Sequence, residues 1–266
     1  MQTQTGAPAR GTTAATDGLL GSLLGGVRWG VDRMLSVGYG LVYDYIYEQF
    51  RPYQQLQAEV LELVGAGAPA GLPKRDVHVL DIGCGPGSFT FVLAEAGFNA
   101  IGLESYAALV ELAREKRRAK RLANLAFRHG DLADGAGIRE ASFDEIVSIH
   151  SLYVHPAPET LLKEAYRILK PGGHAIFVNH TRQVAQWSTF NEIKRRDGVK
   201  PALSSLLWLV PNSIFEAARR RIGPHYWDET RFAANLRAAG FTVLEARRTF
   251  LNGASVLMWA RKDTAD

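Results

Sequence analysis

The sequence predicts an α/β fold built around a mostly parallel sheet. Between residues 77 and 180, short apolar runs alternate with segments of helical periodicity, which is typical of strands connected by helices. A glycine-rich turn follows the first of these runs, and two β-rich runs flank Asn252-Gly253. An Asn-Gly pair between such runs is the strongest short-range signal for an antiparallel hairpin. The chain has 266 residues, 47% of them hydrophobic, which is enough for one large core.

The first predicted strand leads into a turn that is rich in glycine. Residues 77–87 read VHVLDIGCGPG, so Asp81 closes the strand and Gly83, Gly85 and Gly87 follow it. A helical pattern continues over residues 89–96. Glycine suits such a turn because it adopts positive φ angles and lets the main chain approach a ligand. These glycines alternate directly after an acidic residue, which differs from the G-x-G-x-x-G spacing of a dinucleotide site.

The next predicted strands also end in polar residues. Residues 99–104 form the second strand, LAFRHGDL contains the third, FDEIVSIHSLY contains the fourth, and LKPGG at 169–173 is a turn before the fifth. The polar residues at these strand ends are Glu104, Asp131, His150 and His180. Because ligands bind at the carboxyl ends of the strands in doubly wound sheets, these side chains are expected at one edge. Proline near its first position and one apolar face predict a helix over residues 158–169.

This ordered set of motifs, over residues 77–180, resembles the class I S-adenosylmethionine-dependent methyltransferases of the small-molecule type. The resemblance implies a Rossmann-like α/β fold: a seven-stranded, mostly parallel sheet with helices on both faces and a terminal antiparallel hairpin. It also implies S-adenosyl-L-methionine as the cofactor. The hairpin expected around Asn252-Gly253 agrees with this fold, whereas a dinucleotide-binding domain would keep its last strand parallel.

The resemblance implies a role for several residues around the cofactor. The backbone of the glycine turn would approach the methionine part and the ribose, and Glu104 would accept hydrogen bonds from both ribose hydroxyls. Asp131 and the Leu132 amide would meet the adenine, with Ser105 or Tyr106 beside the adenine or ribose. The predicted cofactor-binding residues are Tyr43, Asp81, Gly83, Cys84, Gly85, Gly87, Glu104, Ser105, Asp131, Leu132 and His150.

The expected organisation is a disordered tail at residues 1–18, an N-terminal helical cap at 19–70, and a methyltransferase domain at 71–266. In the cap, Tyr39, Tyr43 and Tyr47 lie four residues apart and form either an aromatic core stripe or a segment that folds over the cofactor. Tyr43-Asp44 resembles a pair found before the core in several small-molecule methyltransferases, which favours Tyr43 in the second interpretation.

The domain contains a lid-like insertion at about residues 181–226. Its apolar residues precede Pro211, where a helix break is expected. Three interpretations remain open for this apolar content: packing against the cap, the wall of an apolar pocket, or a patch for a membrane or a partner.

Methyl transfer is an in-line displacement at the sulfonium methyl group, in which the protein positions a nucleophile, excludes water and, where needed, removes a proton. His150 and His180 are the favoured bases because of their strand-end positions, and Tyr153 would orient the substrate. His155 and His225 are further candidates, although each histidine could instead have a structural role. The predicted acceptor is small or medium-sized and apolar, methylated on a hydroxyl, carboxylate, amine or carbon. The alternative is an S-adenosylmethionine-binding accessory or regulatory protein without turnover.

Composition restricts the remaining functional classes. The 31 basic and 27 acidic residues give a net charge of +4, and the basic clusters fit solvated helix faces, so no nucleic-acid partner is expected. The histidines lack metal-ligand spacing, so no metal is expected. Cys84 is the only cysteine, which excludes an intramolecular disulfide and favours a cytoplasmic location. A peripheral membrane contact and a homodimer are left open, without being predicted.

Overall fold

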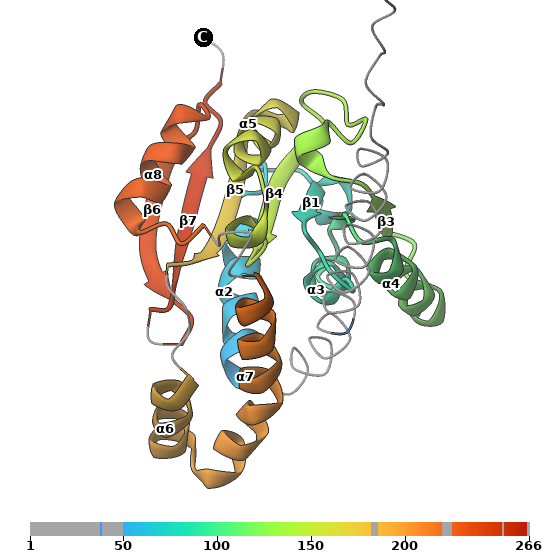
Figure 1. Cartoon of the computed structure of the whole chain (residues 1–266). Helices are drawn as coiled ribbons and strands as arrows, with labels where there is room; N and C mark the ends of the chain where they lie inside the picture. Colours follow the sequence, from blue (N-terminus) through green and yellow to red (C-terminus); the bar gives the residue numbers. More distant parts are fainter. Residues whose placement is uncertain (1–37, 39–49, 182–185, 220–224, 252, 265–266) are drawn as a thin grey trace, which may run out of the picture.

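The computed structural model describes Gly38 and residues 50–181, 186–219, 225–251 and 253–264. A seven-stranded sheet runs through this part of the chain in the order β3-β2-β1-β4-β5-β7-β6 (Figure 1). The strands are β1 (His78–Ile82), β2 (Asn99–Glu104), β3 (Leu125–His129), β4 (Phe143–Ile149), β5 (Leu169–His180), β6 (Thr242–Thr249) and β7 (Ser255–Arg261). Strands β1 to β5 pair in parallel, and β7 runs antiparallel between β5 and β6. The predicted mixed sheet with a terminal hairpin is confirmed.

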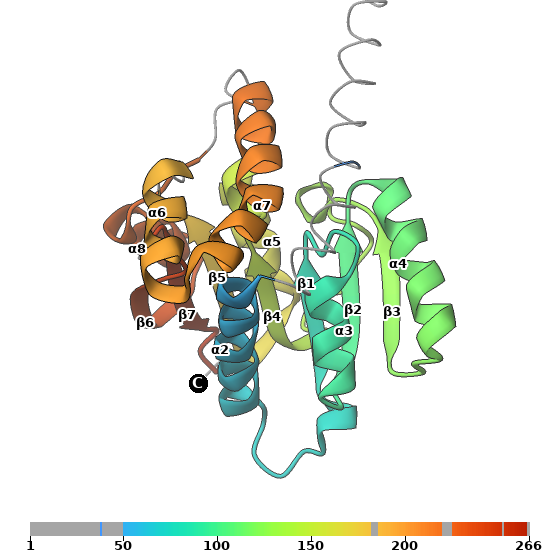
Figure 2. The same ribbon diagram turned by 90° about the horizontal axis from the view of Figure 1, so that it is seen from below.

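Helices cover both faces of the sheet (Figures 1 and 2). One face packs against α2 (Arg51–Gly67), α3 (Ser88–Glu95) and α4 (Ala107–Lys120), and the other against α5 (Pro158–Ile168) and α8 (Glu229–Ala238). The insertion forms α6 (Gln186–Asp197) and α7 (Val199–Arg219), which pack on the α2 side. Short 3-10 turns complete the fold: η1 (Lys74–Asp76), η2 (Leu132–Asp134) and η3 (Leu152–Val154).

The central strands are buried on both sides, which explains their nearly continuous apolar sequences. Val79 of β1 and Val147 of β4 belong to the core under α2, α3 and α4. Their neighbours Leu80 and Ile146 belong to the core under α5 and α8. Successive side chains of a strand point to opposite faces, so each apolar run contributes to both cores.

The carboxyl edge of the sheet gathers the ends of several strands. His180, the last residue of β5, pairs with Ser255, the first residue of β7. Ser255 in turn pairs with Thr249, the last residue of β6. The β6–β7 turn therefore lies at the same edge as the ends of β4 and β5, where the sequence predicts the functional site.

The structure differs from two expectations about the elements, and a third concerns residues that it does not describe. The predicted LKPGG turn lies within β5, which already begins at Leu169. The expected helix break at Pro211 is wrong, because α7 continues through it to Arg219. The missing proline N–H removes one hydrogen bond from the helix interior, while packing against α6 supports the turns of α7. The tyrosines of the cap at positions 39, 43 and 47 lie outside the described residues, as does the predicted tail.

Candidate functional site

Two of the glycines in the turn after β1, Gly83 and Gly85, have different surroundings. Gly83 and Gly85 have φ angles of 69° and 56°, in the left-handed region that favours glycine. The Gly83 amide donates to the Leu103 carbonyl of β2, 2.8 Å away. A Cβ on Gly83 would lie 2.4 Å from the Cβ of Ser151, whereas a Cβ on Gly85 would meet no atom within 4 Å. Gly83 is therefore required for packing, while Gly85 borders open space that a ligand could enter.

Glu104 at the end of β2 connects this turn to the next loop. Its Oε2 accepts a hydrogen bond from the Gly85 amide at 3.0 Å, and its Oε1 accepts from the Tyr106 amide at 2.9 Å. The hydroxyl of Ser105 also donates to Oε1, at 3.2 Å. A carboxylate oxygen can accept about two hydrogen bonds. Among the described residues Oε2 accepts one, so it can still accept a hydrogen bond from a ligand hydroxyl.

Asp81, Cys84 and Gly87 lie in the glycine turn or next to it. Burial raises the pKa of Asp81 to about 7; a hydrogen bond from the Thr90 hydroxyl opposes this shift, and the charge of Glu104 adds to it. Burial also raises the pKa of the Cys84 thiol well above its ordinary value, so the group is a neutral thiol. Gly87 has a φ of 86° and precedes α3 as its N-cap. The Gly87 amide donates to the Cys84 carbonyl at 2.9 Å, a hydrogen bond that closes the turn.

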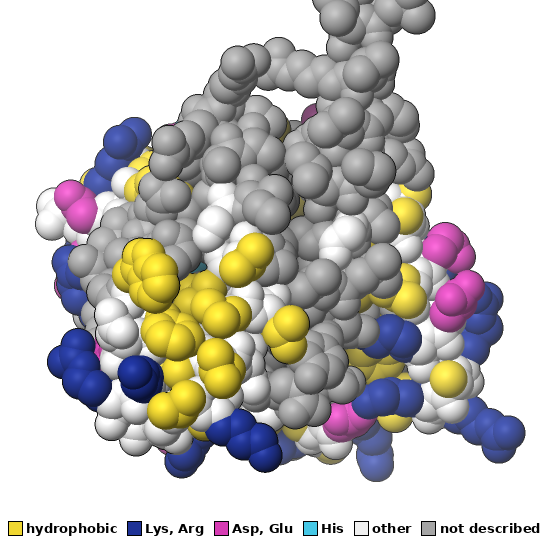
Figure 3. Space-filling model, turned by 60° about the horizontal axis from the view of Figure 1, so that its bottom comes forward, with side chains coloured by type: hydrophobic (Ala, Val, Ile, Leu, Met, Phe, Trp, Pro, Cys, Tyr) yellow, Lys and Arg dark blue, Asp and Glu magenta, His cyan; other side chains and the backbone are white. Residues whose placement is uncertain are grey.

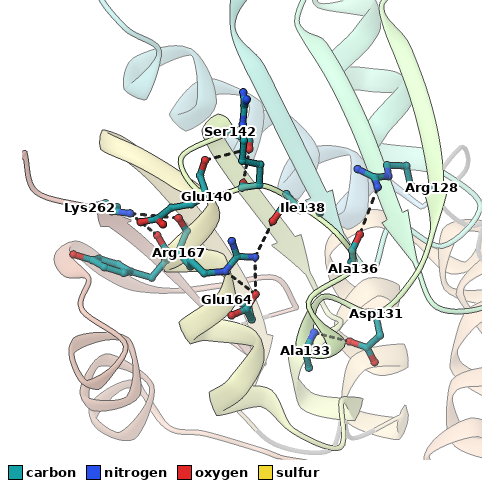
Figure 4. A network of polar contacts seen from close by, with 12 residues as sticks. Arg128, Asp131, Ala133, Ala136, Ile138, Glu140, Ser142, Glu164, Arg167 and Lys262 are labelled. Atoms are coloured by element: carbon teal, nitrogen blue, oxygen red, sulfur yellow. Dashed lines mark hydrogen bonds and ion pairs between the residues drawn. The ribbon is translucent and has the colours of Figure 1, made fainter.

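Asp131 lies just after β3 and is held by two neighbours. Its side chain accepts a hydrogen bond from the Ala133 amide at 2.9 Å (Figure 4). The Nε2 atom of His155 lies 3.0 Å from both carboxylate oxygens, and its Nδ1 accepts from the Ala157 amide. Neutral His155 therefore carries its proton on Nε2 and donates it to Asp131. The pKa of Asp131 is lowered, chiefly by this hydrogen bond.

The loop that follows Asp131 is anchored by arginines (Figure 4). Arg167 of α5 donates to the Ile138 carbonyl at 2.9 Å and to the Glu164 carboxylate at 2.8 Å. Arg128 of β3 donates to the Ala136 carbonyl at 3.4 Å. The side chain of Leu132 is buried in the core on the α5 side. Asp131 is thus presented by a loop that is tied to the sheet and to α5.

Two histidines meet at the carboxyl ends of β4 and β5. The rings of His150 and His180 stack at a centroid distance of 3.9 Å, with 8° between their planes. The hydroxyl oxygen of Ser255 lies 2.8 Å from His150 Nε2 and 3.0 Å from His180 Nδ1. The Tyr53 hydroxyl of α2 lies 3.2 Å from His150 Nδ1. His150 has a φ of 53°, a conformation that costs roughly 1–2 kcal/mol in a non-glycine residue.

Both imidazoles are neutral at physiological pH. Burial lowers the pKa of His150 well below 6.5, and the neighbouring charge of His180 lowers it further. Burial lowers the pKa of His180 to about 3, although a hydrogen bond to the Ala254 backbone opposes the shift. Two stacked imidazolium rings in a buried site would repel each other, which favours the neutral pair.

The Tyr53 hydroxyl, His150, the Ser255 hydroxyl and His180 Nδ1 form one chain of hydrogen bonds, in which the tautomers of the two imidazoles set which atoms donate. His180 Nε2 is buried and has no hydrogen-bond partner among the described residues. In the tautomer that carries its proton on Nδ1, His180 has a lone pair on Nε2.

The other predicted catalytic residues occupy different places. Tyr153 is buried, with its ring edge-on to His180 at 4.9 Å and stacked on Tyr226 at 5.9 Å. The amide of His225 donates to the Tyr153 carbonyl, and its ring lies near Trp227, 6.3 Å away. His155 contacts Asp131 instead of the histidine pair. Of the four histidines considered, only His150 and His180 stack at this edge.

A cavity of 250 Å³ lies beside the histidine pair, between α2, α6 and the β6–β7 turn. It is lined by Pro52, Gln55, Leu56, Glu59, Thr189, Glu192, Ile193, Arg196, Thr249, Phe250 and Leu251. The ring of Phe250 lies 5.0 Å from that of His150 and 4.5 Å from that of Tyr53. Phe250 thus lines the cavity and also lies next to His150 and Tyr53.

Sequence reasoning did not find Tyr53 or Ser255, although both contact His150. Ser255 follows the Asn252-Gly253 turn by two residues, so the hairpin register could have placed it at the carboxyl edge. Tyr53 has no comparable signal, because nothing in its own sequence indicates that α2 crosses the end of β4. The contact between His155 and Asp131 likewise depends on η3, which no pattern predicts.

A family model described as a methyltransferase domain matches residues 73–227, more than half of the chain. The chain belongs to this methyltransferase domain family. The resemblance predicted from the motifs is confirmed, and membership implies S-adenosyl-L-methionine as the cofactor. The described residues fit that cofactor, because the space beside Gly85 is open and Glu104 Oε2 can accept a further hydrogen bond.

Several curated methyltransferases resemble part of this methyltransferase-domain protein. Arsenite methyltransferase from Aquipseudomonas alcaligenes is 33% identical over 163 residues, which cover 50% of this chain and 47% of that protein. Ubiquinone biosynthesis O-methyltransferase from Acinetobacter baylyi is 26% identical over 49% of this chain and 54% of its own length. Demethylmenaquinone methyltransferase from Lactococcus lactis is 33% identical over 38% of this chain and 41% of its own length. The chain spans about half the length of these relatives.

Solved structures share the fold of this methyltransferase-domain protein. An S-adenosylmethionine-dependent methyltransferase from Aquifex aeolicus has a TM-score of 0.54 at 16% identity, covering 82% of this chain and 92% of that one. The CurJ carbon methyltransferase has a TM-score of 0.60 at 15% identity, covering 84% and 58%. The [4+2]-cyclase SpnF has a TM-score of 0.57 at 18% identity, covering 82% and 84%. A cyclase among these neighbours illustrates that the fold alone does not determine the reaction.

Two further findings concern metals and membranes. Within the described residues, no group of three or more His, Cys, Asp or Glu side chains is arranged to hold a metal ion. In the same part of the chain, no helix has the length and apolar character needed to cross a membrane.

Proposed function

We propose that this protein catalyses transfer of a methyl group from S-adenosylmethionine to a small or medium-sized apolar acceptor. Its family supports the reaction class. The observation that carries the acceptor side is the stacked His150–His180 pair, which is buried, neutral and located next to the glycine turn. Ser151, the residue after His150, packs directly against Gly83. The proposed cofactor site and the proposed reaction centre are therefore adjacent.

The cofactor, when bound, supplies an electrophilic methyl group on a sulfonium. The chain's residues position the reactants and exclude water, and such alignment can account for about 7–11 kcal/mol of the barrier. In our proposal the Gly85 main chain and Glu104 bind the ribose side, and Asp131, oriented by His155, binds the adenine. Each of these groups is held by hydrogen bonds of its own, which supports a preformed pocket.

We assign the contact with the acceptor to His180 in preference to His150. Both nitrogens of His150 already contact hydroxyl groups, those of Tyr53 and Ser255. His180 Nε2 is buried and unpartnered among the described residues, and in the tautomer with its proton on Nδ1 it can accept a hydrogen bond. A pKa of about 3 makes His180 a weak base, so its proposed role is to orient a hydroxyl or amine acceptor, and positioning carries the reaction. Tyr153, edge-on to His180, would orient the acceptor.

An apolar acceptor is supported by the aromatic side chains near the pair. Phe250 and Tyr53 lie beside His150, and Tyr153 lies beside His180. Aromatic walls with few polar groups are typical of sites for small apolar ligands. The 250 Å³ cavity that Phe250 also lines carries Glu59, Glu192 and Arg196, so it does not add to these apolar walls.

The test begins with calorimetric titration of the full chain with S-adenosylmethionine and S-adenosylhomocysteine. Phenols, quinols, fatty acids, alkylamines and arsenite are then screened by mass spectrometry for the mass gain of one methyl group. We expect micromolar binding of the cofactor. We also expect turnover of a phenol or quinol, and this turnover should be strongly reduced in His180→Gln. Binding without turnover of any acceptor would favour the accessory protein. Absence of binding to a folded sample would refute the proposed cofactor site.

A further inference from the structure

The helix α7 is apolar on two sides. Ala202 and Leu209 are buried in the core next to α2. On another side, successive apolar side chains are exposed, and they are Val199, Leu203, Leu206, Leu207 and Val210. Their spacings of four, three, one and three residues place them along one face of a helix. The exposed stripe is therefore additional to the face that the core requires.

The neighbouring helix α6 extends this surface. Trp187 is 77% exposed, compared with 56% for Leu203 and 50% for Leu207. Figure 3 shows hydrophobic side chains gathered on this side of the molecule, with Lys and Arg side chains along the margin. We call Trp187 together with the five exposed residues of α7 the α6–α7 patch. A contiguous apolar patch with a polar border marks an interaction site.

The charges around the patch are predominantly basic. Residues 186–210 contain four basic residues, Lys194, Arg195, Arg196 and Lys200, and two acidic residues, Glu192 and Asp197. All four basic residues are exposed. Asp197 pairs with Arg196 at 2.9 Å, which leaves Lys194, Arg195 and Lys200 as the dominant charges. The patch is thus surrounded by net positive charge.

We propose that the α6–α7 patch docks on the surface of membranes that contain anionic lipids. Exposed Trp and Leu side chains would enter the boundary between headgroups and acyl chains, and the lysines and arginines would contact lipid phosphates. Pairing of two copies through this patch would bring like charges together across a symmetric interface, which disfavours a homodimer there. The inference is independent of the proposed reaction, because it depends only on this surface.

Helix α6 contributes residues both to the α6–α7 patch and to the lining of the cavity. Thr189, Ile193 and Arg196 of α6 line the 250 Å³ cavity, while Trp187 is exposed. If the proposed acceptor is lipid-like, docking through α6 would bring the cavity close to the membrane that contains it. This extension rests on the proposed function, whereas the docking itself does not.

The test is flotation of the full chain with vesicles of phosphatidylcholine, with and without phosphatidylglycerol. The unmodified protein is expected to float with the anionic vesicles, and less so as salt increases. Leu203→Gln combined with Leu207→Gln should weaken partitioning at least tenfold, as should Lys194→Glu combined with Lys200→Glu. The matched controls are Leu72→Gln with Leu244→Gln, two exposed leucines outside the patch, and Arg118→Glu with Lys163→Glu, two exposed basic residues on α4 and α5.

Thermal unfolding and cofactor titration of each variant verify that it is folded. Flotation of the double leucine variant at the level of the unmodified protein would overturn the proposal. A folded unmodified protein that stays in solution with both vesicle types would overturn it as well. Light scattering that gives a dimer for the unmodified protein and a monomer for the leucine variant, without flotation of either, would assign the patch to self-association.

Discussion

His150 and His180 stack face to face with their centroids 3.9 Å apart, although they come from different strands. The parallel pairing of β4 with β5 brings the two strand ends together, and the positive φ of His150 turns its side chain back over the sheet edge. Residues held in strained conformations within a well-packed site are candidates for function. The pair is therefore a candidate functional centre of this edge.

The histidine pair predicts a specific pH dependence. Because the pKa of His180 is lowered from 6.5 to about 3, the unfolded state binds more protons than the folded state between these values. The contribution of His180 to stability is therefore present above pH 6.5 and lost as the pH falls toward 3. Urea unfolding should show a shallower decline with acid for His180→Gln than for the unmodified protein. An unchanged slope would mean that His180 is not buried in neutral form.

The same residue should control turnover. If His180 orients the acceptor by accepting its hydrogen bond, His180→Gln should lower kcat by roughly tenfold, the loss of one hydrogen bond of about 1–1.5 kcal/mol, while leaving affinity for S-adenosylmethionine nearly unchanged. No imidazole titration of His180 should appear in the kcat profile between pH 5 and 8, given a pKa of about 3. Stopped assays across this range, with His225→Gln as a matched control, check the prediction. Equal losses of kcat and cofactor affinity would instead indicate a structural role.

Gly83 and Gly85 should respond differently to the same substitution. Gly83→Ala places a Cβ 2.4 Å from that of Ser151, so it should lower the free energy of unfolding by several kcal/mol. Gly85→Ala meets no protein atom within 4 Å, so its cost should be limited to the strain of a positive φ, about 1–2 kcal/mol. Gly85→Ala should nevertheless weaken S-adenosylmethionine binding, because the new methyl group occupies the open space. If a folded Gly85→Ala variant binds S-adenosylmethionine with the affinity of the unmodified protein, the glycine turn does not form part of the cofactor site.

Glu104→Gln should weaken cofactor binding at least tenfold, because a hydrogen bond to a charged group contributes about 1.5–3 kcal/mol. The Gln side chain keeps one oxygen, for either the Gly85 or the Tyr106 amide, so one of these two hydrogen bonds persists and the other is lost. Calorimetry with S-adenosylmethionine measures the effect, and Glu95→Gln, in an exposed pair with Lys120, is the control. Equal affinity in both variants would refute the assignment of Glu104.

Glu145 of β4 offers a test of stability away from the site. It is fully buried, and burial together with the charge of Asp144 raises its pKa from 4.5 to about 10. A raised pKa contributes stability that is present below pH 4.5 and is lost as the pH rises toward 10. Glu145→Gln should therefore gain stability relative to the unmodified protein between pH 6 and 9, as measured by urea unfolding. A constant difference across this range would mean that Glu145 is ionised in the fold.

The sequence was sufficient for the sheet because strand ends and turns are local features. The glycine turn, the acid at position 104 and the Asn252-Gly253 hairpin each carry their own signal, so β1, β2 and the pairing of β6 with β7 could be predicted. The contacts that Tyr53 and Ser255 make with His150 could not be predicted. Tyr53 reaches His150 from a helix 97 residues away, and Ser255 from a strand 105 residues away. Such contacts depend on how the layers pack, which periodicity does not describe.

The insertion illustrates the opposite case, in which a local rule was wrong. Proline in a helix interior usually interrupts it, yet α7 continues through Pro211. The apolar residues before Pro211 were interpreted as packing, a pocket wall or a docking patch. Leu209 packs in the core, whereas Leu203, Leu206 and Leu207 are exposed. Leu209 thus fits the interpretation as packing, whereas the exposed leucines fit the interpretation as a docking patch. The sequence alone could not distinguish them.

The position of Ser255 on β7 also has a consequence for biosynthesis. The glycine turn, Glu104 and Asp131 lie within residues 81–131, after β1, at the end of β2 and after β3, respectively. The hydroxyl between the two histidines arrives only with β7, which inserts between β5 and β6. A growing polypeptide thus contains the residues of the proposed cofactor site well before the ribosome has translated the serine that joins the two imidazoles. The proposed acceptor side of the site therefore depends on about 120 residues of further synthesis after Asp131.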